Sequence, residues 1–139
     1  MTVTTRSTAE TEALGARMAA ALHGGEVLAL YGDLGMGKTA VVRGLASVLC
    51  PEAQVHSPTF SLVNVYGGTP PLVHFDMYRV TDWDDLYATG FFDYREQGAV
   101  LAVEWSEHIE NALPPDAVRI TFSRVDDTTR TITWEGITC

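Results

Sequence analysis

The sequence predicts a single α/β domain in which a mixed β-sheet, with antiparallel hairpins, is flanked by helices. Short apolar runs alternate with stretches of helical spacing, as expected for strands that alternate with helices. Two pairs of predicted strands are joined by connections too short for a parallel crossover. The chain has 139 residues, the length of one domain, and shows no internal repeat or low-complexity linker. Residues 1–139 are therefore interpreted as one unit.

The first predicted helix begins with a capping box. Ser7 is the expected N-cap, and Glu10 stands three residues later, where it can reach back to the cap. Apolar residues then recur at helical spacing: Leu14, Met18, Ala21 and Leu22. Gly24 and Gly25 are expected to end this helix.

The next two elements flank a glycine-rich loop. Val27–Tyr31 is a short apolar run between turn residues, which favours a buried strand. Ala40–Leu49 has helical spacing and ends before Pro51. The sequence thus predicts a strand, a loop and a helix in direct succession.

The remaining strands are predicted mainly as hairpins. Five residues separate Ser61–Tyr66 from Leu72–Asp76, so this pair should be antiparallel. A second hairpin is expected from Val118–Ser123 and Thr129–Trp134, joined around residues 126–127. Val100–Val103 is predicted to be a further buried strand.

A short helix is predicted between the first hairpin and the buried strand. Asp82–Ala88 is expected to form one or two helical turns with Thr81 as the cap. Gly90 follows the helix at its expected exit.

Composition and charge narrow the class of protein. The chain is 46% hydrophobic and has two cysteines, Cys50 and Cys139, which do not form a disulfide framework. No signal peptide is recognised, and no apolar run reaches the roughly 18 residues that a membrane span needs. We therefore expect a cytoplasmic protein that does not associate with a membrane. The net charge of −9 disfavours autonomous binding to nucleic acid.

One segment matches the phosphate-binding pattern G-x-x-x-x-G-K-[ST] in full: Gly32, Asp33, Leu34, Gly35, Met36, Gly37, Lys38 and Thr39. Glycines let backbone N–H groups approach phosphate, and Lys38 supplies a charge for the β and γ phosphates. The Thr39 hydroxyl can ligate Mg²⁺, and the following helix directs its positive end at the same phosphates. Lys38 is the only lysine of the chain, which strengthens the match. ATP and Mg²⁺ are therefore the predicted cofactors.

A phosphate loop needs a second magnesium anchor, normally a carboxylate at the end of a buried strand. Two candidates exist, Asp76 after one apolar run and Glu104 after another. Either could hold the metal, directly or through water, while the other orients the attacking water. Thr59, within Ser57-Pro58-Thr59, could contact the γ phosphate and its metal as switch threonines do, although a capped turn explains the segment equally well.

Four segments together resemble the TsaE (YjeE) family. They are Gly32–Thr39, Ser57–Val63, His74–Arg79 and Val103–Trp105, in the family's order and spacing over nearly the whole chain. The His-x-Asp-x-Tyr-Arg segment and the Glu-Trp pair separate this family from other small nucleotide hydrolases. Met36, Val65 and Ser106 depart from the usual residues, and none of them removes a proposed ligand.

The resemblance implies a P-loop NTPase-like ATPase that supports threonylcarbamoyladenosine modification of tRNA. It implies that Lys38 and Thr39 bind phosphate and magnesium, and that Asp76 and Glu104 are the functional carboxylates. It also implies two partner proteins, TsaB and TsaD, of which TsaD performs the transfer. The tRNA would then be engaged only indirectly, through the complex.

Three other functions fit the phosphate loop alone. Small-molecule kinases share the loop, but they need an arginine-bearing lid, and the arginines after Arg43 stand singly. GTPases carry an Asn/Thr-Lys-x-Asp segment that reads guanine, and the only lysine is already in the loop. A nucleotide-gated binding module, in which hydrolysis is incidental, overlaps with the ATPase interpretation.

Overall fold

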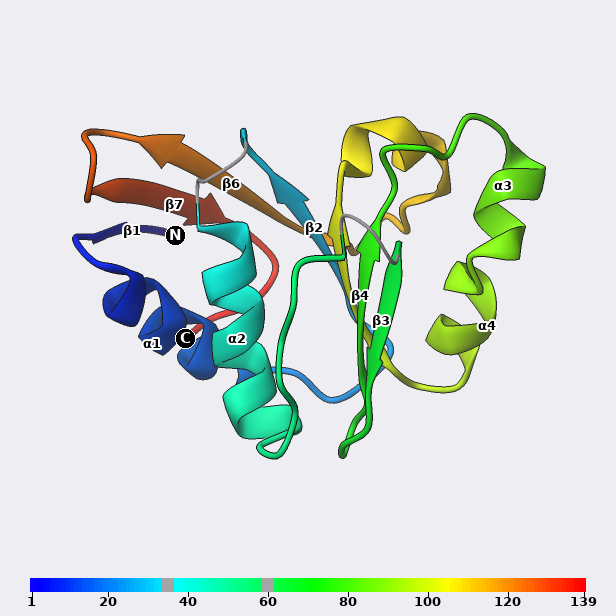
Figure 1. Cartoon of the computed structure of the whole chain (residues 1–139), viewed down its shortest axis with the longest axis horizontal. Helices are drawn as coiled ribbons and strands as arrows, with labels where there is room; N and C mark the ends of the chain where they lie inside the picture. The colour runs from blue at the N-terminus through cyan, green and yellow to red at the C-terminus, as the bar shows by residue number, and fades with distance from the viewer. Residues whose placement is uncertain (34–36, 59–61) are drawn as a thin grey trace.

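The computed structural model describes residues 1–33, 37–58 and 62–139, and within these ranges the chain forms one mixed sheet with helices on both faces (Figure 1). The sheet has seven strands: β1 (Thr2–Thr5), β2 (Val27–Tyr31), β3 (Val63–Tyr66), β4 (Leu72–Asp76), β5 (Val100–Glu104), β6 (Val118–Arg124) and β7 (Arg130–Trp134). The helices are α1 (Thr8–Ala19), α2 (Lys38–Leu49), α3 (Trp83–Ala88), α4 (Phe91–Glu96) and the 3-10 helix η1 (Ser106–Ala112). The predicted fold class is confirmed.

The strand order β1-β7-β6-β2-β5-β4-β3 places four parallel strands in the centre. β6, β2, β5 and β4 pair in parallel, while β3 and the β7–β1 pair are antiparallel at the two sides. Both predicted hairpins are confirmed. Because parallel strands end at the same edge, the residues after β2, β5 and β4 meet along one rim of the sheet.

Two hydrophobic clusters cover the two faces of the sheet. Strand alternation directs residues such as Leu28, Leu30 and Ala102 to a cluster that also contains the apolar residues of α1 and α2. The residues between them, such as Ala29 and Val103, belong to a second cluster with Leu86 of α3 and Phe91 of α4. The central strands are buried on both faces, which explains why they appear in the sequence as continuous apolar runs.

Helices α1 and α2 lie in backbone contact on the first face. A Cβ atom on Gly15 would lie 2.2 Å from the Val41 carbonyl oxygen, and one on Gly44 would lie 2.0 Å from the Glu12 carbonyl oxygen. Only glycine permits such an approach. The contact holds the first turn of α2 beside the start of α1.

The predicted cap of α1 is confirmed, with one difference. The Ser7 Oγ accepts from the Glu10 N–H at 3.1 Å, while the Glu10 carboxylate accepts from the Arg6 N–H, one residue before the cap. The helix ends at Ala19. In the turns that follow, the backbone N–H groups of residues 20–22 each donate to the carbonyl oxygen three residues earlier. Gly24 and Gly25 therefore follow these turns and do not end the helix itself.

The predicted cap of α3 is wrong. Asp82, and not Thr81, is the N-cap, because its Oδ1 accepts from the Asp85 N–H at 2.8 Å. Thr81 stands one residue earlier and donates both its N–H and its hydroxyl to Asp85. Gly90 has a positive φ of 83° after α3, as an exit glycine should, and it also begins α4.

Candidate nucleotide-binding site

The glycine-rich segment connects the end of β2 to the start of α2. Gly32 follows β2 with φ 144°, and Gly37 is the N-cap of α2 with φ 96°. Glycine has no side chain to cap the helix, so the N–H groups of the first turn of α2 are directed at the rim of the sheet. Leu34, Gly35 and Met36 of the predicted loop, and also Thr59, lie outside the described residues.

Lys38 is buried at this rim, with only 6% of its surface exposed. Its Nζ donates to the Gly32 carbonyl oxygen at 2.8 Å and lies 3.7 Å from Glu104 Oε1. The same ammonium group lies 5.8 Å from the centre of the Trp105 ring. The only lysine of the chain therefore joins the loop after β2 to the end of β5.

Glu104 ends β5, the strand beside β2, and it is 8% exposed. Its Oε1 faces Lys38, and its Oε2 lies 2.6 Å from Nε2 of His74 on β4. A carboxylate can only accept a hydrogen bond, so this contact places the imidazole proton on Nε2. His74 is fully buried, and its Nδ1 has no hydrogen-bond partner among the described residues.

A hollow of about 250 Å³ opens beside Lys38 and Glu104. Its lining also includes Gly37, Thr39 and Ser57. Two cationic side chains, Lys38 and Arg43, thus surround a single space together with one carboxylate, one helix N-terminus and hydroxyl-bearing side chains. Four of the predicted site residues, Gly37, Lys38, Thr39 and Glu104, are brought together here.

Asp76 lies one strand farther along the same rim. It is paired in register with Glu104 across β4 and β5, and strand alternation puts it on the same face as His74. Its Oδ1 accepts from the Tyr78 N–H at 2.9 Å, and it borders a second hollow with Leu62 and Arg79. Asp76 therefore shares the rim with Glu104, but it does not line the hollow of Lys38.

Trp105, at the edge of the site, has an unusual backbone. It has φ 58° and ψ 40°, the left-handed conformation that a non-glycine residue adopts at a cost of roughly 1–2 kcal/mol. Its ring lies 4.9 Å from Tyr78 and 5.6 Å from His108. The turn carries the chain from Glu104 directly into η1 and brings an aromatic cluster against Lys38.

The outer side of η1 is fixed to the sheet by a polar triad. The Tyr31 hydroxyl donates to Glu110 at 2.8 Å, and Arg119 donates to the same carboxylate at 2.9 Å. Burial, and then the bond to Glu110, raise the pKa of Tyr31 to about 12. Hydrogen bonds from Arg119 and Tyr31 lower the pKa of Glu110 below its ordinary value.

The donor set suits magnesium and a nucleotide phosphate. Mg²⁺ prefers oxygen ligands and commonly uses one or two carboxylates together with the phosphates of its substrate. Glu104 and the Thr39 hydroxyl provide such oxygens beside the Lys38 ammonium. Across 1–33, 37–58 and 62–139 no three His, Cys, Asp or Glu side chains form a metal-binding group. The site therefore fits a metal held jointly with phosphate better than one held by the protein alone.

His74 and Trp105 were not among the predicted site residues, although both contact residues of the site. A signal for His74 exists, because a single imidazole interrupts the apolar strand two residues before Asp76 and so shares its face. The contacts of Trp105 with Lys38 and Tyr78 depend on the left-handed turn, which no residue pattern predicts.

Comparison with known proteins yields one family. The family model described as "Threonylcarbamoyl adenosine biosynthesis protein TsaE" matches residues 5–132. A Bacillus subtilis protein named "tRNA threonylcarbamoyladenosine biosynthesis protein TsaE" is 39% identical over 130 residues, covering 92% of this chain and 80% of the relative. A Treponema pallidum protein of the same name is 35% identical, with 96% and 98% covered.

A solved structure is also similar. The crystal structure of Bacillus subtilis YdiB superposes with a TM-score of 0.80 at 33% sequence identity, covering 96% of this chain and 83% of that chain.

Proposed function

The chain belongs to the TsaE family and functions in tRNA threonylcarbamoyladenosine biosynthesis; from this premise we propose that it acts there as a magnesium-dependent ATPase. The proposal rests on one observation above all. Lys38 and Glu104 lie 3.7 Å apart, both buried, in a hollow that the N-terminus of α2 and Thr39 also border.

Each part of the site has a physical role. The ammonium group of Lys38 neutralises β and γ phosphate charge, and the first-turn N–H groups of α2 donate to phosphate oxygens. The Thr39 hydroxyl and the Glu104 carboxylate supply hard oxygen ligands. When bound, Mg²⁺ stabilises the negative charge that develops on the transferred phosphoryl group. Phosphoryl transfer needs positioning and charge stabilisation, and these residues can supply both.

Asp76 is proposed as the second functional carboxylate. Its register with Glu104 places it on the same rim, where it would orient water or hold the metal through water. Gly32, Asp33, Leu34, Gly35, Met36 and Gly37 are proposed to surround the phosphates, and Thr59 to contact the γ phosphate.

TsaB and TsaD are proposed as partners, with tRNA engaged only through them. The ATPase is proposed to turn over slowly without these partners. We propose a cytoplasmic location, as expected for tRNA modification. No helix among the described residues is long and apolar enough to span a bilayer.

The test combines binding and turnover. Calorimetric titration should show tighter binding of Mg–ATP than of Mg–GTP, because no guanine-reading segment follows the loop. ATPase activity is then measured alone and with TsaB and TsaD for the wild type and for Lys38→Ala, Glu104→Gln and Asp76→Asn. Each carboxylate variant should lose at least about tenfold in rate, as removal of a metal or water ligand does.

Nucleotide binding separates the roles of these residues. Lys38→Ala should weaken ATP binding by about tenfold to a hundredfold, since a charge-assisted contact contributes roughly 1.5–3 kcal/mol. Glu104→Gln and Asp76→Asn should bind ATP nearly as the wild type does. Full stimulated activity in either carboxylate variant would remove that residue from the mechanism. Phosphate transfer to a small molecule in an acceptor screen would instead identify a kinase.

A further inference from the structure

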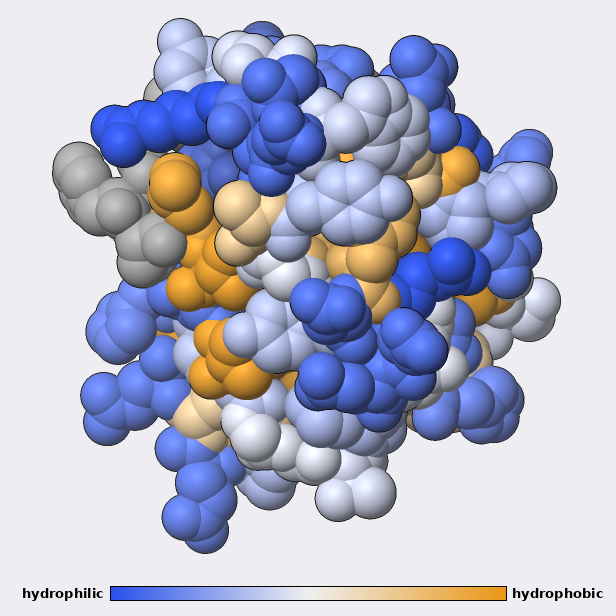
Figure 2. Space-filling view, turned by 90° about the vertical axis from the view of Figure 1, so that its right-hand side faces the viewer, coloured by the Kyte–Doolittle hydropathy of each residue, from blue (hydrophilic) through white to orange (hydrophobic). Residues whose placement is uncertain are grey.

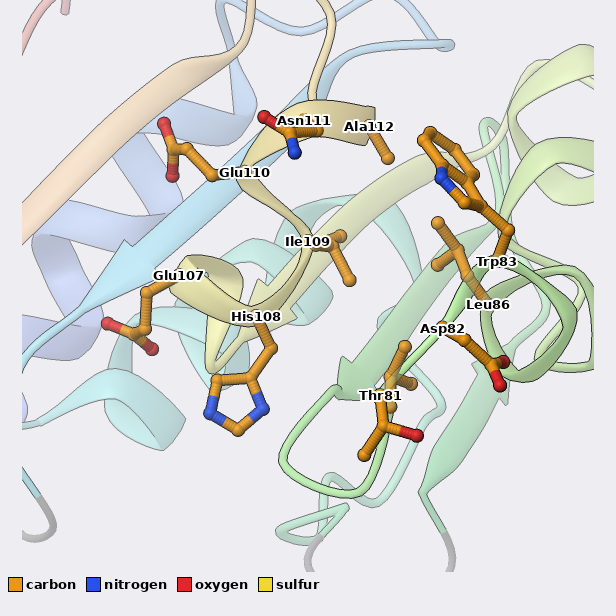
Figure 3. A pocket seen from close by; sticks show the side chains of 11 residues that line it. Thr81, Asp82, Trp83, Leu86, Glu107, His108, Ile109, Glu110, Asn111 and Ala112 are labelled. Atoms are coloured by element: carbon orange, nitrogen blue, oxygen red, sulfur yellow. The ribbon is translucent and has the colours of Figure 1, made fainter.

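A groove lies on the side of the molecule away from α1, between two segments that are distant in sequence. Residues 80–86 form one wall, and residues 107–112 of η1 form the other, enclosing about 370 Å³ (Figure 3). Trp83 and Leu86 come from the first wall, and His108 and Ile109 from the second (Figure 3). Glu107 and Glu110 extend outward from η1 at the rim (Figure 3).

Each wall continues directly from a strand that ends at a proposed functional carboxylate. The first wall follows Asp76 at the end of β4, and the second follows Glu104 at the end of β5. Tyr78 connects the two, because its N–H donates to Asp76 Oδ1 and its ring lies 4.9 Å from Trp105 and 5.8 Å from His108. A molecule bound in the groove would therefore contact the two segments that follow Asp76 and Glu104.

Aromatic side chains extend this groove across α3 and α4. Trp83 is 53% exposed and Tyr87 is 62% exposed, and both pack on the half-buried Phe92, with ring centres at 6.4 and 4.8 Å. Exposed aromatic clusters of this kind supply most of the energy of protein interfaces. Figure 2, which views the right-hand side of Figure 1, shows hydrophobic surface interrupted by strongly hydrophilic residues on this face.

The negative charge around the groove indicates which kind of molecule can bind there. Between Met77 and Ala112, seven exposed acidic side chains stand against two exposed arginines. With a net charge of −9, a second copy of the chain, a nucleic acid and an anionic membrane would all be repelled. A protein surface with basic and apolar side chains is complementary to this face.

We propose that the groove between residues 80–86 and 107–112, with the aromatic side chains Trp83, Tyr87 and Phe92 beside it, is the docking surface for a basic protein partner whose binding adjusts Asp76 and Glu104. The proposal rests on the proposed ATPase function, since it assigns a partner surface and a route of stimulation to that site. The route consists of Tyr78 and Trp105, which join the groove to the two carboxylates and to Lys38.

The experiment uses the purified TsaB–TsaD pair as the probe and the full chain in two sets of variants. The aromatic set is Trp83→Ser with Tyr87→Ser, matched by Val48→Ser with Val125→Ser, two valines exposed elsewhere. The charge set is Asp84→Lys with Glu107→Lys, matched by Asp116→Lys with Glu135→Lys at exposed positions outside both walls. Affinity for the pair, stimulated ATPase rate and binding of ATP alone are measured, and thermal melting checks folding.

The aromatic variant should lose at least about thirtyfold in affinity for the pair, the effect of removing interface anchors. The charge variant should associate more slowly, and its binding should respond less to added salt. Both should lose stimulation while binding ATP alone within about twofold of the wild type, because neither set touches the nucleotide hollow. The control variants should behave as the wild type in every measurement.

The outcomes separate this proposal from the function it rests on. Binding and stimulation that persist in both test variants would overturn the docking surface while leaving the ATPase intact. A wild type that hydrolyses ATP but does not bind the pair would overturn the docking surface together with the proposed partners. A wild type without ATP binding would overturn the proposed function. The wild type and the controls could also self-associate or bind tRNA while the test variants do not. That result would show that this face binds a second copy of the chain or tRNA, and it would overturn the proposal.

Discussion

The Glu104 carboxylate is held from two sides, and this fixes its orientation at the rim of the sheet. Lys38 lies 3.7 Å from one oxygen, and His74 lies 2.6 Å from the other. Residues that hydrogen-bond a metal-ligating or catalytic group orient it, and their loss costs activity even though they do not touch the substrate. We therefore infer that His74 positions Glu104, the proposed functional carboxylate.

Replacing His74 by Leu should lower kcat for ATP hydrolysis by about tenfold or more while changing KM for ATP little, because only the orientation of Glu104 is lost. Gln has an N–H at a similar reach, so His74→Gln should restore much of the rate. Steady-state kinetics of both variants at saturating Mg²⁺ tests this. Equal rates in the Leu and Gln variants, with a common drop in melting temperature, would indicate that His74 only fills the core.

At the residue scale, the sequence predicted the site residues that belong to a motif or end an apolar run. It did not predict the residues that reach the site only through the folded backbone. Lys38 and Thr39 follow from the loop pattern, and Glu104 follows from its place after an apolar run. The place of His74 two residues before Asp76 is a signal in the sequence, but its contact with Glu104 depends on the register of β4 against β5. Trp105 reaches Lys38 only because its backbone is left-handed.

At the scale of elements, the packing of α1 on α2 depends on two glycines that bring the backbones together. Gly44→Ala should destabilise the fold by about 1–3 kcal/mol or more, since its Cβ would lie 2.0 Å from a backbone oxygen that cannot rotate away. Gly67→Ala is the matched control, because a Cβ there meets nothing within 4 Å. Urea denaturation measures both, and equal free energies of unfolding would contradict the close contact.

The attachment of η1 to β2 predicts a pH dependence in the alkaline range. Tyr31 has its pKa raised from 10.0 to about 12, so the folded state retains this proton more tightly than the unfolded state does. The stabilisation is complete below pH 10 and is lost as the pH rises towards 12.

The stability difference between the wild type and Tyr31→Phe should therefore shrink across that window. Denaturant titrations at several pH values measure it, and the other tyrosines contribute equally to both proteins. A difference that stays constant from neutral pH to pH 12 would show that burial and the bond to Glu110 do not raise the pKa of Tyr31.

Elements that contain a continuous apolar run could be predicted from the sequence, and some elements without such a run were missed. β2 and β4 have the predicted bounds, because strands buried on both faces are continuous apolar runs. β1 was missed because its four residues include three threonines and it pairs with β7, more than a hundred residues away. α4 was missed because a glycine without a side-chain cap begins it, and η1 because it follows a left-handed residue.

At the scale of the whole molecule, acidity should keep RNA away from the isolated chain. With a net charge of −9 and few cations to release counterions, we expect tRNA to bind more weakly than roughly 10⁻⁴ M at physiological salt. Fluorescence anisotropy with labelled tRNA tests this, and TsaB–TsaD added to the same cell is the positive control. Micromolar binding by the chain alone would contradict the expectation.

The order of the strands could not be predicted from the sequence. Both hairpins follow from short connections, but the pairing of β2 with both β5 and β6 joins strands separated by dozens of residues. This pairing decides that Glu104 lies next to the loop and that Asp76 lies one strand farther away. The separation of the two carboxylates into different hollows was therefore not foreseen.

The single lysine has a consequence for the covalent chemistry of the protein. A reagent or an enzyme that acylates lysine finds one acceptor side chain among 139 residues. That side chain is 6% exposed and bonded to a backbone carbonyl at the end of β2. Acetyl groups, ubiquitin and amine-directed crosslinkers therefore have no lysine on the outer surface to attach to, and modification of Lys38 would alter the proposed nucleotide site itself.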